Sequence, residues 1–199
     1  MPPATGLALF GHVRFPPDRQ AGNRHNRAVR FLEPVADQPT HWHTIDSPLG
    51  ELRLVGDGRA LTHLQMSPGP EPQGGRHDPD AFGDVEAQLH AYFAGELTEF
   101  DVPLAPSGTG FQLRVWATLL EIPYGETASY GAIAAAVGRP DAVRAVGATN
   151  GRNPIAVIVP CHRVIGADGT LVGYGGGLPR KRLLLELEAE HAAPRLWSG

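Results

Sequence analysis

The chain has 199 residues, of which 42% are hydrophobic and 19% charged, and its formal net charge is −4 at pH 7, which fits one large soluble domain or two small ones. No stretch approaches the ~20 apolar residues that span a bilayer, and the first residues lack a signal-peptide pattern, so we expect a cytoplasmic protein with no membrane partner. The single cysteine, Cys161, excludes an internal disulfide and any zinc site made of several cysteines.

The first forty residues lack the periodicity of a helix or a strand. They hold prolines at six positions and a basic, histidine-containing stretch from Arg19 to Arg30. Such a composition is poorly suited to forming a packed core. We therefore expect residues 1–40 to be a tail or linker, disordered segments included, and residues 193–199 to be a second short tail.

Residues 41–105 are predicted to form an acidic scaffold domain. Trp42 to Met66 contains short strand-like segments separated by turn residues, which is typical of an antiparallel sheet, and Pro68 to Pro79 is expected to be a loop. Asp84 to Gly95 has the apolar spacing of one amphipathic helix, at Val85, Leu89, Tyr92 and Phe93. Eleven acidic residues and three arginines give this domain a balance of −8, and we assign it no chemistry.

Residues 106–192 differ from the preceding strand-like region and are predicted to be mostly helical. Phe111 to Leu120 has apolar residues at helical spacing, and Thr127 to Val137 is expected to be a second helix with Ser129 as its cap. A third helix is expected to start at Asp141, or to be capped by it, and to run to Asn150. Two short helices joined by a tight glycine-containing turn form the helix-turn-helix pattern.

The third predicted helix has a surface of small side chains with one long cation, Arg144; the small residues are Ala142, Ala145, Gly147 and Ala148. A reader of the major groove would need several long polar side chains, so the minor groove of DNA is the better fit, with packing of this helix in the core as the alternative. Residues 139–182 carry seven basic and two acidic residues, a balance of +5 that suits a polyanion, although surface solvation explains such charge equally well.

The only cysteine stands in the run Pro160-Cys161-His162-Arg163-Val164, after an apolar stretch, Ile155 to Val159, that is predicted to be a buried strand. A cysteine acts as a nucleophile only as the thiolate, which a neighbouring imidazole and guanidinium favour. Adjacent residues of a strand point to opposite faces, so His162 can act as the base only if the chain turns at Pro160 or a water bridges the two side chains. The alternative is a buried cysteine that serves as a small hydrophobe.

This run, with Asn153-Pro154 before it and Gly173-Tyr174-Gly175-Gly176-Gly177-Leu178 after it, resembles the active-site signature of the O6-alkylguanine-DNA alkyltransferases, also called methylated-DNA-protein-cysteine methyltransferases. The resemblance extends from about Trp42 to Glu190. It implies an α+β protein with a small N-terminal antiparallel-sheet, ribonuclease H-like domain (41–105). A mostly helical, winged helix-turn-helix domain (106–192) would then bind DNA and accept the alkyl group. The implied function is irreversible, single-turnover DNA repair.

The same resemblance implies a set of catalytic residues. Cys161 would accept the alkyl group, and its proton would pass through water to His162. Glu188, on a predicted helix from Arg180 to Glu190, would orient that histidine. Asn153 would brace the turn that presents the cysteine, as asparagine before proline commonly does.

The resemblance also implies roles in DNA binding. Arg144 would fill the gap left by a flipped nucleotide, and Tyr130 would push against the 3′ phosphate of that nucleotide. The DNA-facing helix would present Ala142, Ala145 and Gly147. The base pocket would be lined by Tyr130, Val164, Tyr174, Gly175 and Gly176. Family members often carry serine at the position of Gly175. The ordinary alternatives are phosphate contact for Arg144 and core packing for Tyr130.

The expected partner is double-stranded DNA that contains O6-alkylguanine, with O4-alkylthymine as a second substrate that the sequence does not decide. We expect no metal and no cofactor, and nothing in the sequence would regenerate the thiol. A monomer in solution is the expected state, and the sequence does not decide whether binding on DNA is cooperative. Two other classes stay open: a Cys-His hydrolase, which would not need Arg144 and would turn over, and a non-catalytic reader of alkylated DNA, which would not need Cys161.

Overall fold

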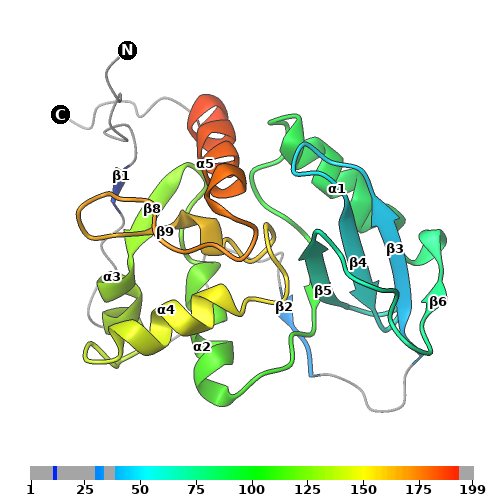
Figure 1. The fold of residues 1–199 in the computed structure, drawn as a ribbon, viewed down its shortest axis with the longest axis horizontal. Coiled ribbons are helices and arrows are strands. Elements are labelled where there is room, and N and C mark those ends of the chain that lie inside the picture. The colour runs from blue at the N-terminus through cyan, green and yellow to red at the C-terminus, as the bar shows by residue number, and fades with distance from the viewer. Residues whose placement is uncertain (1–10, 13–29, 34–38, 193–199) are drawn as a thin grey trace.

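The structure is a computed structural model that describes residues 11–12, 30–33 and 39–192. The tails predicted at residues 1–40 and 193–199 lie mostly or wholly outside these ranges. Figure 1 shows two lobes side by side, one a β-sheet with a helix against it and the other a group of helices around a small sheet. The chain passes from the first lobe to the second between β7 (Pro103–Leu104) and α2 (Gly110–Leu119).

A six-stranded sheet forms the first lobe. Its centre is antiparallel and consists of β3 (His41–Ile45), β4 (Leu52–Gly56) and β5 (Leu61–Met66), which confirms the antiparallel sheet predicted there. Short parallel strands extend it in the order β2-β7-β5-β4-β3-β6, with β2 at Arg30–Phe31 and β6 at Arg76–His77. Strands of two residues are too short to show alternation, so the sequence predicted a loop where β6 lies.

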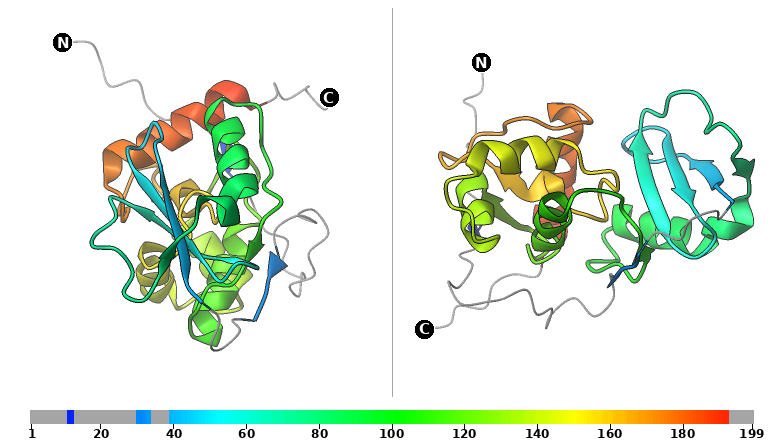
Figure 2. Two further views of the ribbon diagram at one scale, coloured as in Figure 1. Left: turned by 90° about the vertical axis from the view of Figure 1, so that its right-hand side faces the viewer. Right: turned by 90° about the horizontal axis from the view of Figure 1, so that it is seen from below.

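Helix α1 (Gly83–Phe93) follows a short 3₁₀ turn, η1 (Pro79–Phe82), and lies against one face of the sheet (Figure 2). The predicted apolar spacing is confirmed, because Leu89 and Tyr92 are fully buried and Val85 and Phe93 pack partly buried against the core. The buried face of this helix is therefore part of the hydrophobic core.

The second lobe begins with α2, which starts at a reciprocal capping box between Thr109 and Gln112. The predicted second helix is shorter than expected: β8 (Glu126–Ser129) precedes α3 (Tyr130–Ala136), and Ser129 caps α3 as predicted. A three-stranded parallel sheet joins β8 to β1 (Gly11–His12) and to β9 (Val164–Ile165).

Helix α4 (Val143–Gly151) is the second helix of the helix-turn-helix, and α3 and α4 pack together after a turn at Gly138. Asp141 does not cap it. The N-cap is Ala142 without a side-chain hydrogen bond, and the Asp141 carboxylate lies 3.4 Å from Nε of Arg139. The ion pair with Arg139 thus occupies the acidic side chain that the sequence pattern assigned to a cap.

The predicted buried strand Ile155–Val159 is wrong in conformation and right in burial. The segment turns, with Val157 at φ 71° and the N–H of Val159 donating to the carbonyl of Ile155 at 3.0 Å. A short apolar run cannot by periodicity alone distinguish a strand from any other buried segment. The turn leads into η2 (Cys161–Arg163) and β9, and α5 (Leu178–His191) then confirms and slightly extends the last predicted helix.

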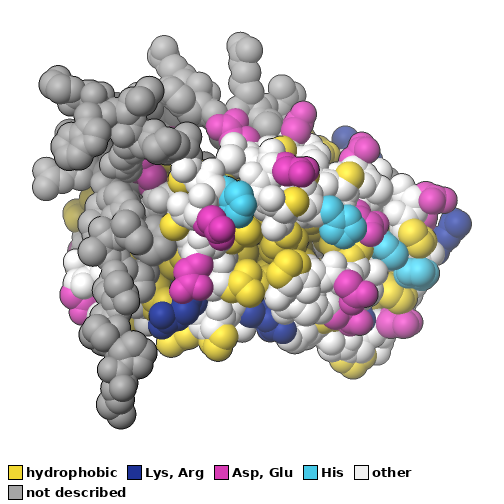
Figure 3. Space-filling model, turned by 90° about the horizontal axis from the view of Figure 1, so that it is seen from above, with side chains coloured by type: hydrophobic (Ala, Val, Ile, Leu, Met, Phe, Trp, Pro, Cys, Tyr) yellow, Lys and Arg dark blue, Asp and Glu magenta, His cyan; other side chains and the backbone are white. Residues whose placement is uncertain are grey.

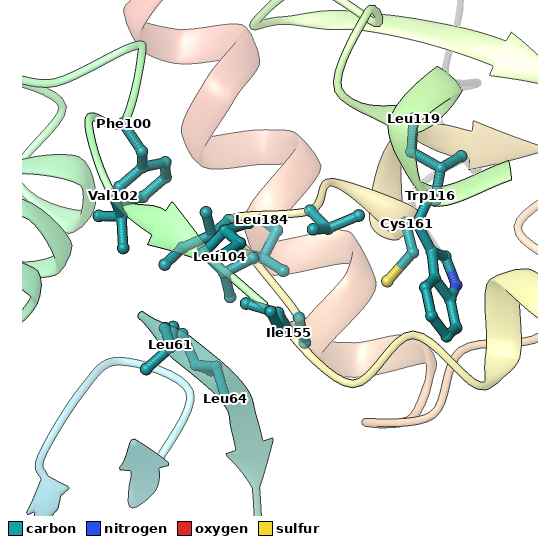
Figure 4. Close-up of a cluster of buried hydrophobic side chains, with 14 of the residues drawn as sticks. Leu61, Leu64, Phe100, Val102, Leu104, Trp116, Leu119, Ile155, Cys161 and Leu184 are labelled. Atoms are coloured by element: carbon teal, nitrogen blue, oxygen red, sulfur yellow. The ribbon is translucent and has the colours of Figure 1, made fainter. Parts of the chain in front are cut away.

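One hydrophobic core runs through both lobes (Figure 4). Leu61 and Leu64 reach it from β5 and meet Ile155, and the N–H of Leu64 donates to the carbonyl of Pro154 at 2.9 Å. The sheet lobe is thereby attached to the segment that leads to Cys161. Among the described residues, no helix combines the length and the apolar character that crossing a membrane requires.

Figure 3 shows the side of the molecule on which α1 and α5 lie in Figure 1. Asp and Glu side chains are spread over it, and Lys and Arg are sparse. A polyanion is repelled by such a face.

Candidate active site

Cys161 is the first residue of η2 and is 4% exposed. Its backbone N–H donates to the carbonyl of Val159 at 2.8 Å, and its side chain lies beside Trp116 in the buried cluster (Figure 4). The chain turns at Pro160, as the sequence required for cooperation between Cys161 and His162. The thiol is thus presented by a buried turn.

Burial raises the pKa of the Cys161 thiol. The amide of Asn153, the ammonium of Lys181 and the backbone N–H groups of Cys161 and His162 act in the opposite direction on this pKa. Arg163 does not assist in the way the sequence indicated, because its guanidinium points to Glu188 and to the carbonyl of Ile122. Thiolate stabilisation therefore comes from other groups than the neighbouring arginine.

His162 and Glu188 form a fully buried pair, with Nε2 of His162 2.8 Å from Oε1 of Glu188. A carboxylate can only accept, so Nε2 carries the proton and donates it. In the neutral imidazole Nδ1 is then an acceptor, and within the part of the chain that the structure describes it is buried without a hydrogen-bond partner. Burial lowers the pKa of His162, while Glu188 works against that change. Burial therefore favours the neutral imidazole.

Glu188 accepts hydrogen bonds from four residues. Arg163 donates from Nε and Nη2, both at 2.9 Å, the Tyr92 hydroxyl donates at 2.7 Å and the N–H of Gly125 at 3.1 Å, in addition to His162. Burial alone would raise the pKa of this carboxyl, but Arg163 and then His162 hold it well below its usual range. The carboxylate is charged at every pH at which the protein is expected to work.

Asn153 brackets the turn before the cysteine. Its amide nitrogen donates to the carbonyl of Val159 at 2.7 Å, and its amide oxygen accepts from the N–H of Ile155 at 3.1 Å. Asn150, at the end of α4, donates to the carbonyl of Cys161 at 3.2 Å. Two side-chain amides thus satisfy backbone groups of this segment that strand pairing does not.

The glycine-rich loop lies near the thiol. Tyr174 is partly buried, its hydroxyl is 3.7 Å from the sulfur of Met66, and the Cys161 charge is among the causes that raise its pKa after burial. A Cβ on Gly176 would come within 2.7 Å of Met66, whereas one on Gly175 would lie 3.7 Å from its nearest neighbour. Gly175 therefore has room for a side chain, and Gly176 has little.

Tyr130 joins this loop to the helix-turn-helix. Its hydroxyl donates to the carbonyl of Val172 at 3.2 Å, and a Cβ on Gly147 of α4 would lie 3.8 Å from its ring. Val164 is fully buried in β9 and its carbonyl accepts from Lys181 at 2.6 Å. The structure thus brings Tyr130, Val164 and Tyr174 to the region of the thiol.

The exposed face of α4 is the one that the sequence singled out. Arg144 and Ala145 are exposed, Ala142 and Gly147 are half-buried, and Val146, Thr149 and Asn150 face the core. The helix therefore divides into a packed face and an exposed face of small side chains around one arginine. Such a face can approach a nucleic-acid groove closely.

Two family models match the chain: "6-O-methylguanine DNA methyltransferase, DNA binding domain" over residues 110–190, and "6-O-methylguanine DNA methyltransferase, ribonuclease-like domain" over residues 40–106. The chain belongs to the 6-O-methylguanine DNA methyltransferase family. This confirms the family, the α+β fold class and the reaction class expected from the sequence, which is direct-reversal DNA repair by transfer of an alkyl group to a protein cysteine.

Relatives in this family align over most of the chain. The methylated-DNA–protein-cysteine methyltransferase of Mycobacterium tuberculosis is 61% identical over 155 residues, covering 76% of this chain and 94% of the relative. That of Methanosarcina acetivorans is 51% identical over 152 residues, covering 74% and 97%. The crystal structure of Mycobacterium tuberculosis OGT in complex with DNA has a TM-score of 0.73 at 61% identity, covering 76% of this chain and 94% of that one.

Sequence reasoning missed two buried residues that contact the candidate site. Tyr92, assigned only to the core face of a helix, reaches Glu188 from the other lobe. Lys181 is fully buried and donates to the carbonyls of Val164 and Val172 at 2.6 and 3.0 Å. Composition offered a signal for Lys181, because it is the only lysine in a chain that otherwise uses arginine.

Proposed function

We propose that the protein removes alkyl groups from O6 of guanine in double-stranded DNA by transferring each one to the sulfur of Cys161, once per molecule. The observation that carries this proposal is the buried pair next to the thiol. Nε2 of His162 is held by Glu188, which leaves Nδ1 as an acceptor without a partner among the described residues. A base held in this way beside the only thiol of the chain suits proton removal from that thiol.

The reaction balances without a cofactor. The thiol proton passes through a bridging water to Nδ1 of His162, and the thiolate attacks the alkyl carbon in line with the bond to O6. The sulfur–carbon bond forms as the carbon–oxygen bond breaks, and the electron pair of the broken bond stays with the guanine. The guanine ring takes up a proton from water as His162 releases the thiol proton to water, so the protons balance. The hydroxyl of Tyr130 and backbone N–H groups of the glycine-rich loop are suited to neutralise charge on the leaving base.

A thiolate in a buried turn cannot reach a stacked base, so the nucleotide must leave the helix. The exposed Arg144 would fill the space that the flipped nucleotide leaves, and Tyr130 would contact the 3′ phosphate of that nucleotide. Ala142, Ala145 and Gly147 allow α4 to enter the minor groove. This assignment rests on the exposure pattern of α4 and on the position of Tyr130 beside Gly147.

The flipped base would lie against Tyr174 and Val164, with backbone groups of Gly175 and Gly176 toward its edge. The room at Gly175 is consistent with a contact made by the main chain. Asn153 would keep the cysteine turn in place during attack. We retain residues 41–105 as the scaffold domain and residues 106–192 as the DNA-binding and alkyl-acceptor domain, between tails at 1–40 and 193–199.

We further propose a cytoplasmic protein that is monomeric in solution. A free thiol fits a reducing compartment.

The proposal is tested on duplex DNA in which one O6-methylguanine blocks a restriction site. Incubation with the protein should restore cleavage to an extent equal to the amount of protein added, and Cys161→Ser should restore none while still binding the lesion. Restoration by Cys161→Ser would refute the role of the cysteine. Restoration beyond one site per molecule would show turnover and refute a suicidal transfer.

A further inference from the structure

Tyr92 is the residue through which the sheet lobe reaches the relay. It lies on α1, is fully buried, and donates from its hydroxyl to Oε1 of Glu188 at 2.7 Å across 96 positions of sequence. Its ring is fixed by three aromatic neighbours, Phe93, Phe100 and Tyr124, at centroid distances of 5.4, 5.2 and 6.0 Å. A hydroxyl held so firmly has one geometry available to it.

The oxygen that Tyr92 contacts is the one that holds His162. Oε1 of Glu188 accepts from the Tyr92 hydroxyl at 2.7 Å, from Nε2 of His162 at 2.8 Å and from Nη2 of Arg163 at 2.9 Å, while Oε2 accepts from Gly125 and from Nε of Arg163. Hydrogen bonds to a carboxylate are among the strong ones, and the donors on one oxygen share its charge. Tyr92 therefore weakens the attraction of Oε1 for the proton on His162.

We propose that Tyr92, a residue of the scaffold lobe, is a positioning residue of the Cys161–His162–Glu188 relay that sets the pH range in which His162 is free to take the thiol proton. The inference rests on the relay described under Proposed function. It gives the acidic first lobe, to which the sequence assigned no chemistry, a part in the reactivity of the cysteine.

The direction of the effect follows from the charges around the pair. Glu188, Arg163 and Lys181 act on the pKa of His162, and Arg163 and His162 act on the pKa of Glu188. Removing the neutral Tyr92 hydroxyl changes none of these formal charges. It leaves more negative charge on Oε1 toward His162, so the imidazolium is favoured up to a higher pH and the base is lost earlier as pH falls.

The test is the pH dependence of methyl transfer from duplex O6-methylguanine DNA in a single turnover, comparing wild type with Tyr92→Phe. The acid limb of the profile should move to higher pH by about one unit, so that transfer on that limb is about tenfold slower, while the plateau rate and the dissociation constant for DNA stay within about twofold.

Tyr124→Phe is the matched control. Its ring stacks edge-on against Tyr92, and its hydroxyl is buried but makes no hydrogen bond within the described part of the chain. Its acid limb should coincide with that of wild type. In a Glu188→Gln background, Tyr92→Phe should shift nothing further, because the hydroxyl acts through the carboxylate.

A Tyr92→Phe profile that coincides with that of Tyr124→Phe would overturn the inference, including the case in which Tyr92→Phe only lowers the melting temperature. If Tyr92→Phe does not fold, 3-fluorotyrosine placed at position 92 serves instead. Its more acidic hydroxyl donates more strongly and should move the acid limb to lower pH, and an unmoved limb would again overturn the inference. Failure of the proposed function would show itself differently, as absence of transfer by wild type at every pH.

Discussion

Arg163 and Glu188 form a two-pronged buried ion pair, with Nε and Nη2 of the arginine each 2.9 Å from a carboxylate oxygen. The same carboxylate holds His162, so a structural ion pair and the proposed relay share one residue. Arg163 thereby fixes the orientation of the carboxylate that orients the imidazole. Its remaining guanidinium nitrogen, Nη1, donates to the carbonyl of Ile122 at 2.6 Å.

Replacing Glu188 with glutamine should destabilise the protein strongly, because Arg163 would be left as a buried charge without its partner. We expect a loss of about 3–5 kcal/mol in the free energy of unfolding at neutral pH, measured by urea denaturation. Glu186→Gln, an exposed neighbour on α5, is the control and should change it by less than about 0.5 kcal/mol. Equal losses in the two variants would contradict the ion-pair account.

The cost of Glu188→Gln should also depend on pH. The pKa of Glu188 is lowered in the folded state, so its stabilising contribution is present above its unfolded pKa of about 4.3 and is lost as pH falls below that value. The difference between wild type and Glu188→Gln should therefore be constant from pH 7 to pH 5 and shrink in more acidic buffers. A difference that grows on acidification would reverse the sign of the inferred pKa change.

Lys181, the only lysine of the chain, is buried against two carbonyl groups. Burial lowers its pKa to about 8, and the Cys161 charge raises it. A lowered lysine pKa gives stability that is complete above the unfolded pKa of about 10.4 and is lost as pH falls toward 8. This is tested in a Cys161→Ser background. Between pH 8 and pH 10, the free energy of unfolding of the protein that keeps Lys181 should rise by up to about 3 kcal/mol relative to that of Lys181→Met. Parallel stability curves would show that this ammonium is not perturbed.

Arg144→Ala should impair repair without affecting the fold, because the side chain is exposed on α4. We expect an unchanged melting temperature, transfer from duplex DNA slowed by at least about tenfold, and an unchanged reaction with the free alkylated base, which needs no flipping. Arg139→Ala removes another exposed arginine of the helix-turn-helix, one paired with Asp141, and should slow transfer by less than about twofold. Equal effects of both substitutions on duplex transfer would indicate general phosphate attraction.

Alkylation itself should loosen the structure. Cys161 is almost fully buried beside Trp116 in the common core, and one added methyl group in a close-packed site costs about 1–3 kcal/mol. The methylated protein should therefore melt at a lower temperature and dissociate from DNA faster than the unmodified one. Identical melting temperatures for the two forms, measured by scanning calorimetry, would contradict a tightly packed acceptor site.

The sequence indicated the elements whose side chains repeat regularly. The core face of α1, the Ser129 cap and the extent of α5 could be predicted, because helical spacing and capping are local properties. The segment Ile155–Val159 could not, because its turn depends on hydrogen bonds from Asn153 and on the contact of Ile155 with β5. Local pattern carries no information about such partners.

The site divides in the same way. Cys161, His162 and Asn153 stand in one short motif, and Glu188 could be located only because the motif resembles that of a known family. The contact of Tyr92 with Glu188 joins residues 96 positions apart and leaves no local pattern. Lys181 offered a compositional sign, an isolated lysine among arginines, but its burial depends on the packing of α5 against β9 and the glycine-rich loop.

The central claim, that Cys161 accepts one alkyl group from DNA, is tested most directly by the intact mass of the protein after incubation with excess duplex O6-methylguanine DNA. The account predicts a gain of one methyl group, ~14 Da, per molecule, located on the peptide that contains Cys161 and absent from Cys161→Ser. An unchanged mass while the lesion is bound, or a gain on a peptide that lacks Cys161, would contradict it.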